Sequence, residues 1–191
     1  MMKYLLLIIG LGVTTFNTFC QSTPTRTTRY SISAGIGFVH YFNTLRIGAD
    51  VVDENSLGFN GLIMWEPEHR LALGFESGYY TFYSASRITP SGSTARVSLA
   101  AVPILLTIRM RVYKNFFVST GTGVTILTSE ANVLGSLAEN SQTSFATFQA
   151  TALYLKPIGK HFKIGGEFKY LNVAKTEDSV MAISGLVAYQ F

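Results

Sequence analysis

Residues 70–83 read RLALGFESGYYTFY, and large apolar side chains alternate along them with small or charged ones. Leu71, Leu73 and Phe75 fall on one face of an extended chain, whereas the opposite face holds small residues, Glu76 and Tyr80. A period of two is typical of a β-strand that has one apolar face. This stretch therefore predicts a strand whose two faces meet different surroundings.

The same alternation recurs along the rest of the chain. It predicts eight strands, over residues 29–42, 57–66, 70–83, 95–112, 116–129, 144–156, 162–172 and 180–191. The spacers alternate between short turns and longer polar loops, as in an up-and-down meander that crosses a slab. We therefore expect an all-β protein, an eight-stranded antiparallel up-and-down barrel.

The position of the large apolar faces separates a soluble barrel from a transmembrane one. A soluble lipocalin-like ligand-binding barrel turns these faces inward and carries charge outside, whereas a membrane barrel turns them to lipid. The opposite faces here hold mostly Gly, Ala, Ser and Thr, and charged residues make up only 14% of the chain. This composition favours a transmembrane barrel, with the soluble barrel as an alternative. Aromatic residues near strand ends are expected in interfacial girdles: Tyr41, Phe42, Trp65, Tyr83, Phe116, Phe117, Phe162 and Tyr170.

A few ionisable residues interrupt the small faces of the predicted strands. If those faces line the lumen, acids and bases must pair there, because an unpartnered buried charge is costly. We interpret six residues as a lumen charge network: Glu66, Glu76, Arg109, Arg111, Glu167 and Lys169.

The first twenty residues have the pattern of a secretory signal peptide, with Lys3 followed by an apolar run over residues 4–13. We expect cleavage after Cys20. A lipoprotein signal is the alternative, but it requires a small residue where Phe19 stands. The expected organisation is a signal peptide over 1–20, a flexible periplasmic arm over 21–28 and an outer-membrane barrel over 29–191. The expected location is the outer membrane of a Gram-negative bacterium.

Residues 100–126, AAVPILLTIRMRVYKNFFVSTGTGVTI, combine three features. Pro103 precedes an apolar strand, residues 113–115 form a short turn, and Gly121 and Gly123 lie in the next strand. The segment resembles the fourth and fifth strands of the outer membrane protein beta-barrel domain family, which includes PorT-like proteins, and the overall architecture resembles the OmpA/OmpX-like barrels. The resemblance implies the fold and the compartment, and it carries no catalytic signature.

The chain ends on residues 183–191, ISGLVAYQF, with apolar side chains at every second position. This ending resembles the C-terminal signal that the barrel-assembly machinery recognises on its substrates. We therefore expect Val187, Tyr189 and Phe191 to form an assembly signal on the lipid-facing side of the last strand.

The sequence gives little support for catalysis. An outer-membrane lipid-modifying hydrolase, the alternative function, would need a histidine paired with a serine and an acid at the outer rim. Only His40 falls near that rim, and aromatic residues follow it. There is no His/Cys cluster, and the acids of residues 50–54 lack the spacing of a calcium loop. We expect no enzymatic activity, no catalytic residue, no metal and no cofactor.

The charge distribution bears on partners. The net charge is +4, but the basic residues form no run or stripe, which argues against nucleic acid, and the long loops are net acidic. The expected partners are outer-membrane lipid and lipopolysaccharide, the barrel-assembly machinery and another envelope protein. The expected function is structural or interactive: envelope integrity, adhesion, or an accessory subunit of an envelope or secretion complex.

Overall fold

The computed structural model describes residues 28–42, 52–67, 70–88, 94–133, 136–174 and 178–191. The regular structure of these residues is entirely β: β1 Arg29–Phe42, β2 Val52–Asp53, β3 Asn55–Glu66, β4 Leu71–Ile88, β5 Thr94–Tyr113, β6 Phe116–Val133, β7 Ser136–Ile158, β8 Phe162–Val173 and β9 Asp178–Gln190. In this part of the chain no helix is long and apolar enough to cross a membrane. The predicted signal peptide and most of the predicted arm lie outside the described residues.

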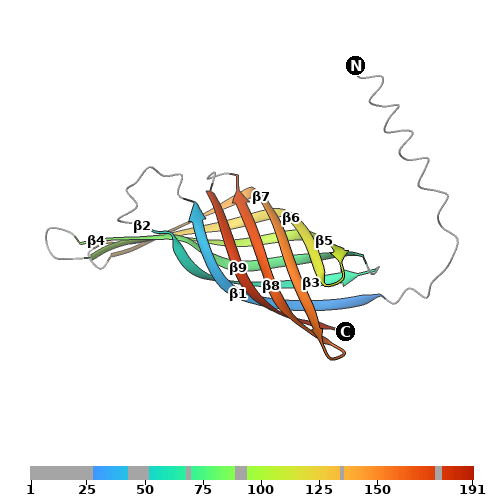
Figure 1. Ribbon diagram of the computed structural model, residues 1–191. Helices are drawn as coiled ribbons and strands as arrows, with labels where there is room; N and C mark the ends of the chain where they lie inside the picture. Colours follow the sequence, from blue (N-terminus) through green and yellow to red (C-terminus); the bar gives the residue numbers. More distant parts are fainter. Residues whose placement is uncertain (1–27, 43–51, 68–69, 89–93, 134–135, 175–177) are drawn as a thin grey trace, which may run out of the picture.

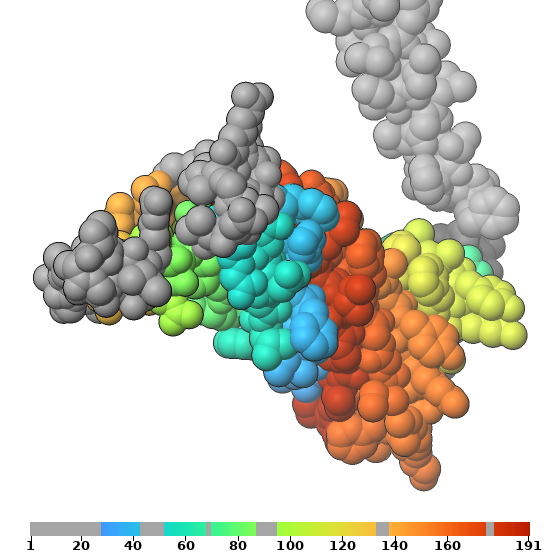
Figure 2. Space-filling model, turned by 60° about the vertical axis from the view of Figure 1, so that its left-hand side comes forward, coloured from blue at the N-terminus to red at the C-terminus, as the bar shows by residue number. Residues whose placement is uncertain are grey.

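Eight of these strands close into a barrel. Each pairs antiparallel with its neighbours in the order β1–β3–β4–β5–β6–β7–β8–β9, and β9 returns to β1. The two-residue β2 pairs with β4 beyond the end of β3, on the same edge of β4. Figure 2 shows β1 on the outer wall, flanked by β3 and β9. The predicted eight-stranded antiparallel barrel is confirmed, and its closure leaves no unpaired strand edge within the wall.

The short connections between strands need special backbone conformations. Lys114 has φ 40° in the turn between β5 and β6, and Gly159 has φ 77° in the turn between β7 and β8. Glycine adopts positive φ without a steric penalty, whereas lysine pays one. The chain ends beside the second turn (Figure 1), where the Gln190 N–H donates to the His161 carbonyl at 2.8 Å. The short-turn end of the barrel therefore also holds the C-terminus.

The outer wall of the barrel is apolar. Phe75, Ile63 and Ile183 expose 67%, 60% and 66% of their surface, and the other strands contribute similar outward rows. The soluble barrel would have turned Leu71, Leu73 and Phe75 inward, and that alternative is wrong because all three are exposed. A continuous apolar wall of this extent suits contact with lipid.

Four strands are longer than the sequence predicted. β4, β5, β6 and β7 have 18, 20, 18 and 23 residues, and their pairing continues to Ile88↔Thr94 and Val133↔Ser136. The loops predicted over 84–94 and 130–143 are therefore mostly strand. Beyond the membrane both faces of a sheet meet water, so the apolar alternation that marks a strand disappears there. We name residues 84–88, 94–98, 129–133 and 136–146 the outer extension, which projects beyond the ends of β1, β8 and β9 (Figure 1).

Candidate functional site

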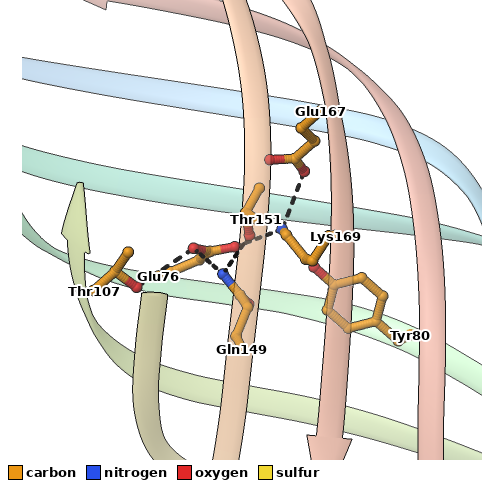
Figure 3. Close-up of polar contacts among 7 residues, drawn as sticks. All are labelled: Glu76, Tyr80, Thr107, Gln149, Thr151, Glu167 and Lys169. Carbon is orange, nitrogen blue, oxygen red and sulfur yellow. Dashed lines mark hydrogen bonds and ion pairs between the residues drawn. The ribbon is translucent and has the colours of Figure 1, made fainter. Parts of the chain in front are cut away.

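The middle of the lumen is organised around Lys169 of β8, which is 1% exposed. Its Nζ lies 2.5 Å from Oε1 of Glu76 and 3.0 Å from Oε1 of Glu167 (Figure 3). The contact with Glu167 is an ion pair rather than an aligned hydrogen bond, because Glu167 Oε1 has no hydrogen-bond partner. In the closed strand order β4 stands opposite β8, so the contact with Glu76 crosses the barrel.

Neutral side chains complete the coordination of this ion pair. Gln149 Nε2 donates to Oε2 of Glu76 at 2.7 Å, and Thr107 Oγ1 lies 3.5 Å from the same oxygen. Lys169 Nζ also donates to the Tyr80 hydroxyl at 3.1 Å. These residues come from β4, β5, β7 and β8, so the network ties together half of the wall. Such a network stabilises a filled lumen, because each buried charge meets polar partners.

Arg109 supplies a second positive charge near this network. Its side chain is 5% exposed, and its Nε has no hydrogen-bond partner. It interacts through space with the carboxylates of Glu76, Glu66 and Glu167. Two carboxylates around Lys169 leave one negative charge in excess, and Arg109 balances that charge at longer range.

The remaining predicted network residues lie nearer the short-turn end. Glu66 accepts hydrogen bonds from Ser31 Oγ and Gln190 Nε2, both at 2.9 Å. The Arg111 guanidinium lies 5.3 Å from the centre of the Phe117 ring. Glu66, Arg109 and Arg111 line one small cavity. All six predicted lumen residues thus lie on the inner faces, but the structure divides them into a group around Lys169 and a group near the turns.

Between the ion pair and the outer extension, the lumen contains an apolar cluster that the sequence analysis did not predict. Tyr41 and Phe82 are fully buried and stack at 5.9 Å between ring centres, and the Tyr41 hydroxyl donates to Asp178. Other members are Val39, Tyr80, Ala101, Leu105, Leu127, Leu171, Val173, Val180 and Ala182. The signal for this cluster was present in residues 79–83, which are bulky on both faces. The cluster fills the barrel where small residues were expected.

The predicted aromatic girdles are correct only in part. Tyr41, Tyr83 and Phe117 point inward or pack against the lumen, so their assignment to a girdle is wrong. Consecutive strand residues face opposite sides, so only one of Tyr41 and Phe42 can face lipid. The side chains of Phe42, Trp65, Phe116 and Phe162 are exposed on the outer wall.

His40 lies exposed on the outer wall near the rim. Its Nδ1 is 3.0 Å from Asn55 Oδ1, and its ring meets Phe42 edge to face. Among the described residues, no serine or carboxylate is hydrogen-bonded to His40, so the geometry gives the hydrolase alternative no support. The same part of the chain contains no group of three or more His, Cys, Asp or Glu residues that could hold a metal ion.

The predicted assembly residues face outward at the end of the barrel. Val187 and Phe191 are exposed, and the Tyr189 ring packs edge to face against Phe191 and Phe162, at 4.9 and 5.0 Å between centres. The Phe191 N–H donates to the Tyr30 carbonyl at 2.9 Å. The C-terminal residue therefore continues the pairing that closes the barrel.

Comparison with known proteins bears on the fold alone. No family model matches the chain, and no curated protein matches it. The structure is similar to that of Ail, the attachment invasion locus protein of Yersinia pestis, solved with the heparin analogue sucrose octasulfate (TM-score 0.59, 15% identity, 86% of this chain and 99% of that one). It is also similar to Neisserial surface protein A (TM-score 0.55, 12% identity, 85% and 97%). The chain thus has the fold of outer-membrane β-barrels.

Proposed function

We propose that this protein is an integral outer-membrane barrel that contacts another envelope or surface protein through its outer extension. The observation that carries the proposal is the edge of β7. Residues 136–142 pair with β6 on one side, whereas pairing with β8 begins only at Thr147↔Val173. Within the described residues no strand covers the other side of residues 136–142. An open edge of this length can accept an extended segment of a partner by strand addition.

Two acidic side chains on the outer extension indicate the charge that a partner should carry. Glu130 and Glu139 lie directly opposite each other in the register of β6 and β7, and both are exposed. Like charges in directly opposite positions repel, so a basic or cation-bridged partner would relieve the repulsion. We therefore favour a basic, extended protein segment, with lipopolysaccharide bridged by divalent cations as a secondary contact.

The filled lumen favours contact over transport. The ion pair of Lys169 with Glu76 and the apolar cluster occupy successive levels of the interior. An eight-stranded barrel encloses only enough room for side chains. The adhesion role and the role as an accessory subunit of a secretion complex, which the PorT-like resemblance suggests, are both compatible with this arrangement, since neither requires a pore.

Site-specific photocrosslinking in living cells tests the proposed contact. A photoreactive amino acid at Ser141, exposed on the extension, should give a discrete protein adduct, whereas the same group at Phe38, 76% exposed on the apolar wall, should not. Replacing residues 129–140 by Asn-Gly, a two-residue hairpin closed by the pair Thr128↔Ser141, should abolish the adduct without unfolding the barrel. No adduct at Ser141, or equal adducts at both positions, would refute the proposal.

A further inference from the structure

The short-turn end of the barrel holds a cavity of about 250 Å³ that is lined by cations. Its basic side chains come from β1, β5, β8 and the two turns, and none of the carboxylate side chains that the structure describes lines it. We name this group the basic mouth: Arg29, Arg111, Lys114, Lys160 and Lys163. Five like charges around one cavity repel one another, so the arrangement is most stable when an anion occupies it.

The described residues do not neutralise the basic mouth. In this part of the chain the only ion pairs are those of Lys169, so none of the five cations has a carboxylate partner. Arg111 Nε is buried without a hydrogen-bond partner, as is Nε of Arg109 in the adjoining cavity. Glu66, which lines the adjoining cavity and is hydrogen-bonded to Ser31 and Gln190, interacts through space with Lys163, but its single charge does not balance five cations. Buried donors without partners indicate that the site can donate further hydrogen bonds to a bound ligand.

The position of the cations narrows the choice of anion. Arg111 and Lys163 belong to the inner faces of β5 and β8, so they point into the mouth and away from the lipid that surrounds the wall. Residues 21–28 contain an arginine and no acid, so the preceding segment of this chain cannot neutralise the site. The planar guanidinium donates in pairs to phosphate oxygens, and clustered cations favour a compact anion with several charges.

We propose that the basic mouth is a binding site for a phosphate-bearing anion. Arg111 donates from the inner side of the cavity, and Lys114, Lys160 and Lys163 supply charge around it. The site lies at the end of the barrel opposite the outer extension, and it does not depend on the contact proposed there.

Calorimetric titration of the mature barrel tests the site directly. In dodecyl maltoside, an uncharged detergent, inorganic triphosphate should bind saturably with one site per barrel. Arg111→Gln and Lys114→Gln should each weaken binding about tenfold or more, because each removes a charge-assisted contact. Lys156→Gln, an exposed cation on the outer wall, and Arg96→Gln, at the far end, remove the same charge and should leave binding within about twofold of wild type. Lys114 lies in an exposed turn, so its variant should fold even if the Arg111 variant does not.

A competition experiment identifies the source of the phosphate. If dihexanoyl phosphatidylglycerol displaces triphosphate, the site binds a lipid headgroup. If it does not, the site binds a free phosphate compound. Both results support the proposal. Three results would overturn it: no saturable binding of either probe, equal weakening by the Lys156 and Arg96 variants, or tighter binding of a hexaglutamate peptide than of triphosphate.

Discussion

Lys169 Nζ and Glu76 Oε1 meet at 2.5 Å across the lumen, although 93 residues separate them in the chain. This contact joins opposite walls of the barrel, and its removal is the most direct test of the lumen network. Lys169→Met should lower the free energy of unfolding by about 3–5 kcal/mol, because it leaves the carboxylates of Glu76 and Glu167 buried without their cation. Urea unfolding in lipid vesicles, followed by the fluorescence of Trp65, the single tryptophan, measures the change.

Glu76→Gln should cost less than Lys169→Met, because Lys169 keeps Glu167 at 3.0 Å. Lys156→Met is the matched control for the loss of a lysine, since its side chain is exposed on the outer wall. A Lys169 variant as stable as the Lys156 variant would show that the ion pair contributes nothing to the stability of the barrel.

The orientation of the wall predicts the effect of a charge on its outer face. Phe75→Arg should destabilise the barrel in vesicles by about 2–4 kcal/mol, because the guanidinium would stand near the middle of the hydrocarbon layer. Ser141→Arg on the outer extension should be close to neutral. On a soluble barrel an outward Phe75→Arg change would be harmless, so a neutral result in vesicles would argue against the lipid-facing assignment.

The C-terminal residue is predicted to act in assembly. Deleting Phe191 should reduce the amount of heat-modifiable barrel in the outer membrane, because Phe191 completes the outward row with Tyr189 and pairs with Tyr30. Refolding of the same variant in detergent separates two causes. Normal refolding with poor assembly in cells indicates lost recognition by the assembly machinery, whereas a defect in both indicates lost closure. Unchanged assembly in cells would contradict the predicted signal.

The turn between β7 and β8 should be sensitive to a single methyl group. Gly159 has φ 77°, so Gly159→Ala should cost about 1–2 kcal/mol of stability. Gly185→Ala is the control, since an added Cβ there meets open space and the backbone is not in the left-handed region. The control should change stability by less than about 0.5 kcal/mol. Equal effects in both variants would mean that the turn is not held in this conformation.

The outer extension marks a limit of reasoning from sequence patterns. Residues 84–94 and 130–143 look like loops because they are polar on both faces, yet most of them pair as strands. Hydrogen bonds between backbones hold these strands, and backbone pairing leaves no pattern in the side chains when both faces meet water. The apolar cluster was missed for a related reason. Tyr41 and Phe82 look like girdle or wall residues until it is known which residues of each strand face the lumen.

The sequence by itself determined the wall of this protein. Its period of two placed Leu73 and Phe75 outside and Glu76 and Lys169 inside, because lipid and lumen impose opposite chemistry on alternate residues of every strand. Only the tertiary structure decided which inward residues meet. The pairing of Lys169 with Glu76, the hydrogen bond between Ser31 and Glu66 and the gathering of cations at the basic mouth depend on the stagger and tilt of strands around the closed barrel. These are properties of the whole ring, so no local pattern in the chain contains them.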